Sequence, residues 1–96
     1  MASTEKFLKS TAEKLGEEAS FRPMMGEYLV YWRGKHVGGI YDDRLLIKQS
    51  AATLGLDTAE PYPGAREMAI ARGDAEALRA LMEAQYSALP EKKGKK

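Results

Sequence analysis

Residues 24–50 have the sequence MMGEYLVYWRGKHVGGIYDDRLLIKQS, and this stretch decides the fold because apolar runs alternate in it with tight-turn residues. Tyr28–Trp32 is rich in aromatic and branched residues, which favour a pleated surface. Lys35–Tyr41 and Arg44–Lys48 are two further runs of this kind. The pattern predicts three consecutive antiparallel strands joined by two tight turns.

The two turns are predicted from the residues between the runs. Gly34, after Arg33, supplies the positive φ that a two-residue hairpin loop needs. Asp42-Asp43 makes the second break, since aspartate tolerates the left-handed region and bonds to its own backbone. Gly38-Gly39 lies inside a strand, where glycine marks a bulge or the close approach of a ligand or another backbone. Of these we expect a bulge that curves the sheet.

The three runs are apolar at nearly every position instead of alternating with polar residues. Continuous apolar strands are typical of a sheet that is covered on both faces. A chain of 96 residues has little material with which to cover both. We therefore expect helices of the same chain on one face and a second copy on the other, which makes a homodimer.

The flanking segments predict the rest of the architecture. We expect an α+β fold with an N-terminal helix, a curved antiparallel sheet of about five strands and a C-terminal helix. Helices are predicted at 3–15 and 75–89, strands at 19–25 and 65–71, and a single helical turn at 51–54. Pro23 lacks an amide donor, so the strand that contains it is expected either to lie at an edge of the sheet or to carry a bulge.

Length and charge limit the classes of function. The length indicates one domain, expected over residues 1–90, followed by a disordered lysine-rich tail over 91–96. That tail holds four lysines and one acid, so the body has eleven basic and thirteen acidic residues. An acidic body lacks the positive surface of a duplex-binding protein. Nucleic-acid contact is therefore expected to be weak, and only through the tail.

The residue types argue against several kinds of chemistry. The chain has no cysteine, which excludes disulfides, thiolate nucleophiles and cysteine metal sites. His36 is the only histidine and is expected to be an ordinary strand residue, as Asp42-Asp43 is expected to be an ordinary turn. No phosphate-binding glycine motif occurs. We expect no catalytic residue, metal or cofactor, and, without a signal peptide or membrane-spanning run, a cytoplasmic protein.

The aromatic residues of the strands are the strongest candidates for a binding surface. Tyr31 is predicted to share a strand face with Leu29, while Tyr28 and Trp32 share the other. Packing in the core is one interpretation, and a patch for a protein partner is the other, since Tyr, Trp, Met and Arg are enriched in such patches. The candidate interaction surface comprises Arg22, Met25, Gly26, Tyr28, Tyr31, Trp32, Tyr41 and Arg44.

One set of motifs covers nearly the whole chain, from Thr4 to Pro90. It comprises Arg22-Pro23-Met24-Met25-Gly26-Glu27-Tyr28, Tyr31, Gly34-Lys35, Gly38-Gly39-Ile40-Tyr41-Asp42-Asp43-Arg44-Leu45, Lys48, Tyr62-Pro63-Gly64-Ala65, Met68 and Tyr86 through Leu89-Pro90. In this set the chain resembles the N-terminal domain of the TfoX (Sxy) competence regulators, in particular the small stand-alone branch of that family.

The resemblance implies a fold of the secretion-chaperone class, frequent pairing of two copies and a non-enzymatic regulatory or interaction role linked to competence. It brings no catalytic residues. Longer members of the family carry a second domain and a different sequence where this chain has Arg22–Leu29. Two alternatives stay open: a nucleic-acid-associated regulator that uses the lysine tail and the hairpin aromatics, and a small ligand-binding protein or enzyme with a pocket beside Gly38-Gly39.

Overall fold

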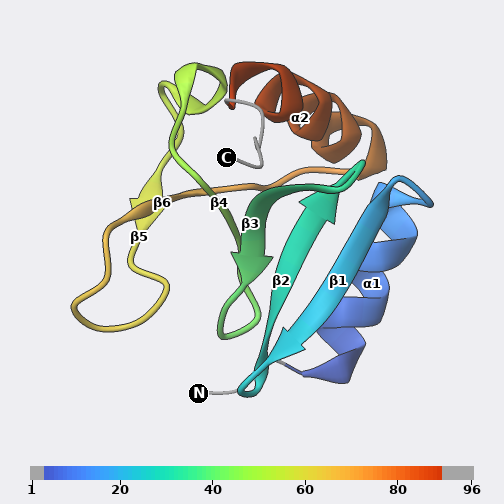
Figure 1. Cartoon of the computed structure of the whole chain (residues 1–96), viewed down its shortest axis with the longest axis vertical. Helices are drawn as coiled ribbons and strands as arrows, with labels where there is room; N and C mark the ends of the chain where they lie inside the picture. Colours follow the sequence, from blue (N-terminus) through green and yellow to red (C-terminus); the bar gives the residue numbers. More distant parts are fainter. Residues whose placement is uncertain (1–3, 90–96) are drawn as a thin grey trace, which may run out of the picture.

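A computed structural model describes residues 4–89, and these form two helices packed on a six-stranded antiparallel sheet (Figure 1). The helices are α1 (Glu5–Leu15) and α2 (Ala75–Ala88), and the short 3₁₀ helix is η1 (Ala51–Thr53). The strands are β1 (Ala19–Met24), β2 (Glu27–Trp32), β3 (Lys35–Ile40), β4 (Leu45–Ile47), β5 (Thr58–Ala59) and β6 (Met68–Ile70). Their order in the sheet is β1-β2-β3-β4-β6-β5, which confirms the α+β prediction.

Three two-residue turns connect the first four strands. Arg33 and Gly34 have φ values of 52° and 84°, the left-handed pair that matches the twist of a hairpin. Asp42 and Asp43 have φ values of 55° and 58°, and Tyr41 and Arg44 on either side exchange backbone hydrogen bonds of 2.9 and 3.0 Å. Both predicted turns are confirmed. Ionic contacts of its side chain with Glu18 and Glu83 hold Arg33 in place.

The bulge in β3 lies at Val37, next to Gly38, while Gly39 keeps its regular pairing with Leu29. Val30 pairs with Gly38 while Tyr31 pairs with His36, so the register between β2 and β3 shifts by one residue. A Cβ on Gly38 would lie 2.6 Å from the Cα of Ile47, and one on Gly39 would lie 2.7 Å from the ring of Tyr41. Both glycines are thus required by the close approach of other parts of the same chain.

The main core lies between one face of the sheet and the two helices. Figure 1 shows α1 behind β1, with α2 across the end of β2 and β3. The buried residues of this core come from both helices and from four strands, and one of them, Ala71, directly follows β6. They are Leu15, Val30, Trp32, Val37, Ile40, Leu45, Ile47, Ala69, Ala71, Leu78 and Met82.

A buried glutamine joins α2 to the sheet. Gln85 is fully buried, and its Nε2 donates to the carbonyl of Lys48 at 2.7 Å and to that of Val37 at 3.4 Å. Its Oε1 accepts a hydrogen bond of 2.6 Å from the hydroxyl of Ser50, which also caps η1. One side chain therefore fixes the end of β4, the start of η1 and the last turns of α2 relative to each other.

The region after β4 differs most from the sequence prediction. The strand predicted at 65–71 is only Met68–Ile70, because Ala65 still belongs to a turn in which its amide donates to Tyr62 O. Strand β5 was not predicted, and it raises the number of strands to six. It has two residues, and its stability comes from pairing with β6 and not from a local apolar pattern.

Candidate functional site

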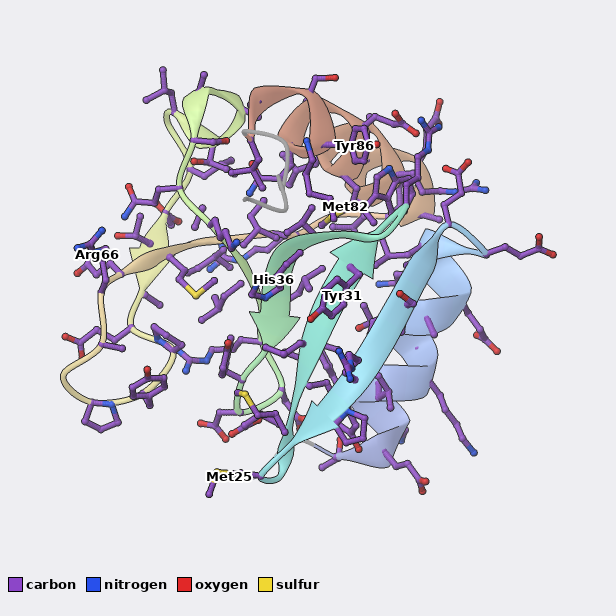
Figure 2. The ribbon with its side chains drawn as sticks, viewed as in Figure 1. Met25, Tyr31, His36, Arg66, Met82 and Tyr86 are labelled. Atoms are coloured by element: carbon purple, nitrogen blue, oxygen red, sulfur yellow. The ribbon has the colours of Figure 1, made fainter. Side chains whose placement is uncertain are left out.

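The outer face is the side of β1–β3 that turns away from both helices. Direct cross-strand partners share a face, so the register places Ser20, Tyr31 and His36 in one row and Arg22 and Leu29 in the next. Figure 2 shows Tyr31 and His36 beside each other on this face, with ring centroids 5.2 Å apart. The full outer face comprises Ser20, Arg22, Met24, Glu27, Leu29, Tyr31 and His36.

The structure divides the strand aromatics of the candidate interaction surface between the core and the outer face. Trp32 is only 1% exposed, and its indole Nε1 donates to Glu83 of α2 at 3.3 Å. Tyr28 packs against the same core from β2. The side chains of β2 that share a strand face with Trp32 therefore point toward the helices, and those that share a face with Tyr31 belong to the outer face. Trp32 is unavailable to a partner or to a nucleic-acid base.

Tyr41 and Arg44 are structural as well. Tyr41 is 7% exposed, and its ring lies against Gly39 on the outer side of the sheet, 6.4 Å from the ring of Tyr62. Burial, and then the nearby Tyr62 and Glu27, raise the pKa of its hydroxyl above the usual value. Arg44 donates to the carbonyls of Tyr41 and Glu60 and so ties the β3–β4 turn to the segment after β5.

The remaining predicted residues lie on or near the outer face. Arg22 is exposed on β1, and Met25 and Gly26 form the turn at the tip of the β1–β2 hairpin. Met25 is 98% exposed with a φ of 49°, and Figure 2 shows it projecting from the tip. Met24 beside it is also exposed. The structure therefore brings Arg22 and Tyr31 onto one face, with Met25 beyond its end.

The predicted interaction surface missed five members of the outer face, which are Ser20, Met24, Glu27, Leu29 and His36. Alternation along β1 gives Ser20, Arg22 and Met24 as one set, so the pattern held the information. The position of His36 opposite Tyr31 depends on the bulge, and no local pattern fixes the exact residue at which a bulge occurs. At Gly38 and Gly39, where a pocket was one alternative, backbone and side-chain atoms of the chain lie within 3 Å of the position that a Cβ would take.

The described part of the chain contains no cluster of three or more His, Cys, Asp or Glu side chains positioned to hold a metal ion. His36 lies with Nε2 2.9 Å from the carbonyl oxygen of Gly38, a local contact within its own strand. Between residues 4 and 89 no helix has the length and apolarity needed to cross a membrane. The lysine tail at 91–96 lies outside the described residues.

Comparison with known proteins adds no assignment. Scans of protein-family models, of curated proteins and of solved structures each found no match to this chain.

Proposed function

We propose that this chain is a non-enzymatic protein-interaction module that pairs with a second copy of itself through the outer face. The observation that carries the proposal is the one-sided placement of the helices, which leaves Leu29, Tyr31 and His36 on a face that neither helix covers. Tyrosine and arginine are enriched in protein interfaces, and this face combines Tyr31 with Arg22. A regulatory role in the cytoplasm, of the kind implied by the TfoX resemblance, is part of the same proposal.

The hairpin tip supplies a second argument. A non-glycine residue in the left-handed region costs roughly 1–2 kcal/mol, and asparagine is tolerated there far better than methionine. Met25 has this conformation and is almost wholly exposed, so burial within the chain does not offset the cost. The fold does not need an apolar side chain at this position. A contact made outside the chain explains why a flexible, polarisable methionine stands there.

The geometry favours pairing through the face over pairing through the edge. β1 is an edge strand, and Pro23 within it removes one amide donor from the row that an added strand would need. The outer face also carries opposite charges, with Arg22 on β1 and Glu27 on β2. In a two-fold symmetric pair the same patch meets itself, so Arg22 of one copy can lie opposite Glu27 of the other.

Nucleic-acid binding through the hairpin aromatics is disfavoured by the position of Trp32. A stacking platform needs exposed rings, and this ring lies in the core beside Glu83. Tyr31 is the aromatic residue that the outer face retains, and it is half-buried.

The test compares two charge substitutions by sedimentation velocity over a range of micromolar concentrations. Tyr31→Glu places a charge at the centre of the outer face and should convert the dimer to a monomer. Leu54→Glu is the matched control, since Leu54 is 81% exposed and directly follows η1, which packs against α2. It should leave the dimer intact. A wild-type protein that stays monomeric, or two variants with equal effects, would refute pairing through this face.

A further inference from the structure

We propose that a cavity between α1, the β3–β4 turn and the segment that leads into α2 binds a small organic anion with an apolar body. This α1 cavity has a volume of about 330 Å³, which is within the range of small-molecule sites. Its lining is contributed by three stretches far apart in the chain, at residues 7–14, 43–45 and 70–78. The site lies on the helix side of the sheet, so it is independent of the outer face and of pairing.

The deeper wall of the α1 cavity is apolar. Leu45 and Leu78 line it, and both are members of the buried core. Phe7 of α1 and Ala71, which follows β6, complete this part of the lining. At about 30 Å³ for each water-sized group, the space holds a ligand of roughly ten non-hydrogen atoms. A ligand of that size with an apolar body would gain affinity by displacing water from these side chains.

Thr11 is the observation that points to a polar ligand group. Its side chain lines the cavity, the residue is only 5% exposed, and its hydroxyl makes no hydrogen bond to any described residue. Buried hydroxyls are nearly always bonded, because an unmade hydrogen bond costs free energy. The carbonyl of the preceding helical turn, a common partner of threonine in helices, is not used here. An acceptor atom of a ligand would satisfy this donor.

The charges around the cavity select the sign of the ligand. Lys14, Arg44 and Arg72 contribute three positive charges to the lining, and Asp43 contributes one negative charge. The Asp43 carboxylate accepts hydrogen bonds from the amide and the hydroxyl of Thr4, so it is already occupied. Lys14 makes no ion pair with any described residue.

The lining of the α1 cavity therefore offers more hydrogen-bond donors and positive charges than acceptors and negative charges. A ligand that completes this set has an acceptor-rich anionic group, either a carboxylate or a phosphate, directed toward Lys14 and Thr11. Its apolar end lies against Phe7 and Leu78. Arg72 forms an exposed ion pair of 3.6 Å with Asp57, so it contributes less to the attraction than Lys14 does.

The test uses octanoate and octyl phosphate as probes and octanol as the neutral control of equal chain length. Chemical shifts of backbone amides are followed in the full chain. Both anions should shift the amides of Thr11, Lys14 and Gly73 at millimolar concentration, and octanol should bind more weakly. A preference for one anion identifies the carboxylate or the phosphate as the group selected. Absence of shifts at these amides, or equal affinity for octanol, would overturn the proposal.

Two variants separate binding from a structural effect. Lys14→Gln should weaken octanoate binding about threefold, while Lys9→Gln, on α1 but outside the lining, should not. Thr11→Val removes the unbonded hydroxyl at nearly constant shape. It should weaken binding about fivefold and at the same time raise the melting temperature of the unliganded protein. Equal loss in both lysine variants, or a Thr11→Val protein that binds as the wild type does, would contradict the assignment.

Discussion

Replacement of Gln85 by methionine is expected to destabilise the fold strongly although the two side chains have similar size. In the wild type the amide of Gln85 donates to Lys48 O at 2.7 Å and accepts from Ser50 Oγ at 2.6 Å. Methionine fills the space without replacing either hydrogen bond. The carbonyl of Lys48 and the hydroxyl of Ser50 then lose a partner where α2 packs on the sheet.

The expected loss is about 3 kcal/mol, since each polar group left without its partner costs roughly 1–3 kcal/mol. A chain of this length has a total free energy of unfolding of roughly 5–14 kcal/mol, so the variant loses a large share of it. The melting temperature should fall by about 15 °C. Val37 O keeps its hydrogen bond from the Lys48 amide and therefore adds little to the loss.

Urea unfolding monitored by Trp32 fluorescence measures the change, and a double-mutant cycle isolates the pair. Ser50→Ala leaves the Oε1 of Gln85 without its donor, so the double variant should lose at least about 1 kcal/mol less than the sum of the single variants. Gln49→Met is the control, since Gln49 is exposed and loses only a solvent-exposed hydrogen bond to Glu67 O, which should change stability by less than about 1 kcal/mol. Either of two results would refute the role of Gln85 in attaching α2 to the sheet. One is a Gln85→Met protein as stable as the control, and the other is a double variant whose loss of stability equals the sum of the two single losses.

Three further predictions concern single positions. Met25→Asn should raise the free energy of unfolding by about 1 kcal/mol and weaken pairing, a combination that sedimentation and urea unfolding test together. The raised pKa of Tyr41 means that the folded state holds the hydroxyl proton more tightly than the unfolded state does. Above about pH 10 the free energy of unfolding of the wild type should therefore fall relative to that of Tyr41→Phe, and below this pH the difference between the two proteins should stay constant. Urea unfolding at several pH values measures this difference. Gly39→Ala should cost about 2–3 kcal/mol because its Cβ would meet the Tyr41 ring, whereas Gly34→Ala, which has open space at a φ of 84°, should cost about 1 kcal/mol in the same urea assay.

The hairpins were predictable because their information is local. Gly34 and Asp42-Asp43 supply left-handed turns, and the residues between them favour strands whatever surrounds them. A bulge near Gly38-Gly39 was predictable because glycines inside a strand often mark one, but its position at Val37 was not. The two-residue β5 was not, because only its pairing with β6 makes it a strand.

The faces of the sheet could be grouped from the sequence but not oriented. Alternation separates Tyr31 from Trp32, yet which set meets the helices depends on packing that the local pattern does not encode. The sequence also predicted that both faces of the strands would be covered. Leu46, between two core residues of β4 and pointing the other way, is fully buried within a single copy. Part of the second face is thus covered by the chain itself, and only β1–β3 keep an outer face.

The α1 cavity could not be predicted at all. Its lining comes from α1, the β3–β4 turn and the segment before α2, and these stretches meet only in the folded chain. Thr11 looks in the sequence like one more small residue on the apolar side of a helix. Its lack of a hydrogen-bond partner is a property of the packed structure.

The central claim is that two copies meet through the outer face, and paramagnetic relaxation between copies tests it most directly. The chain has no cysteine, so a Ser20→Cys variant carries a single spin label on β1, and it is mixed with an isotope-labelled wild-type copy. The predicted result is broadening of the amide signals of Leu29, Tyr31 and His36 in the isotope-labelled copy, with the amide signals of α1 and α2 unaffected. Broadening centred on the helices, or none at concentrations where the protein is dimeric, would contradict the account.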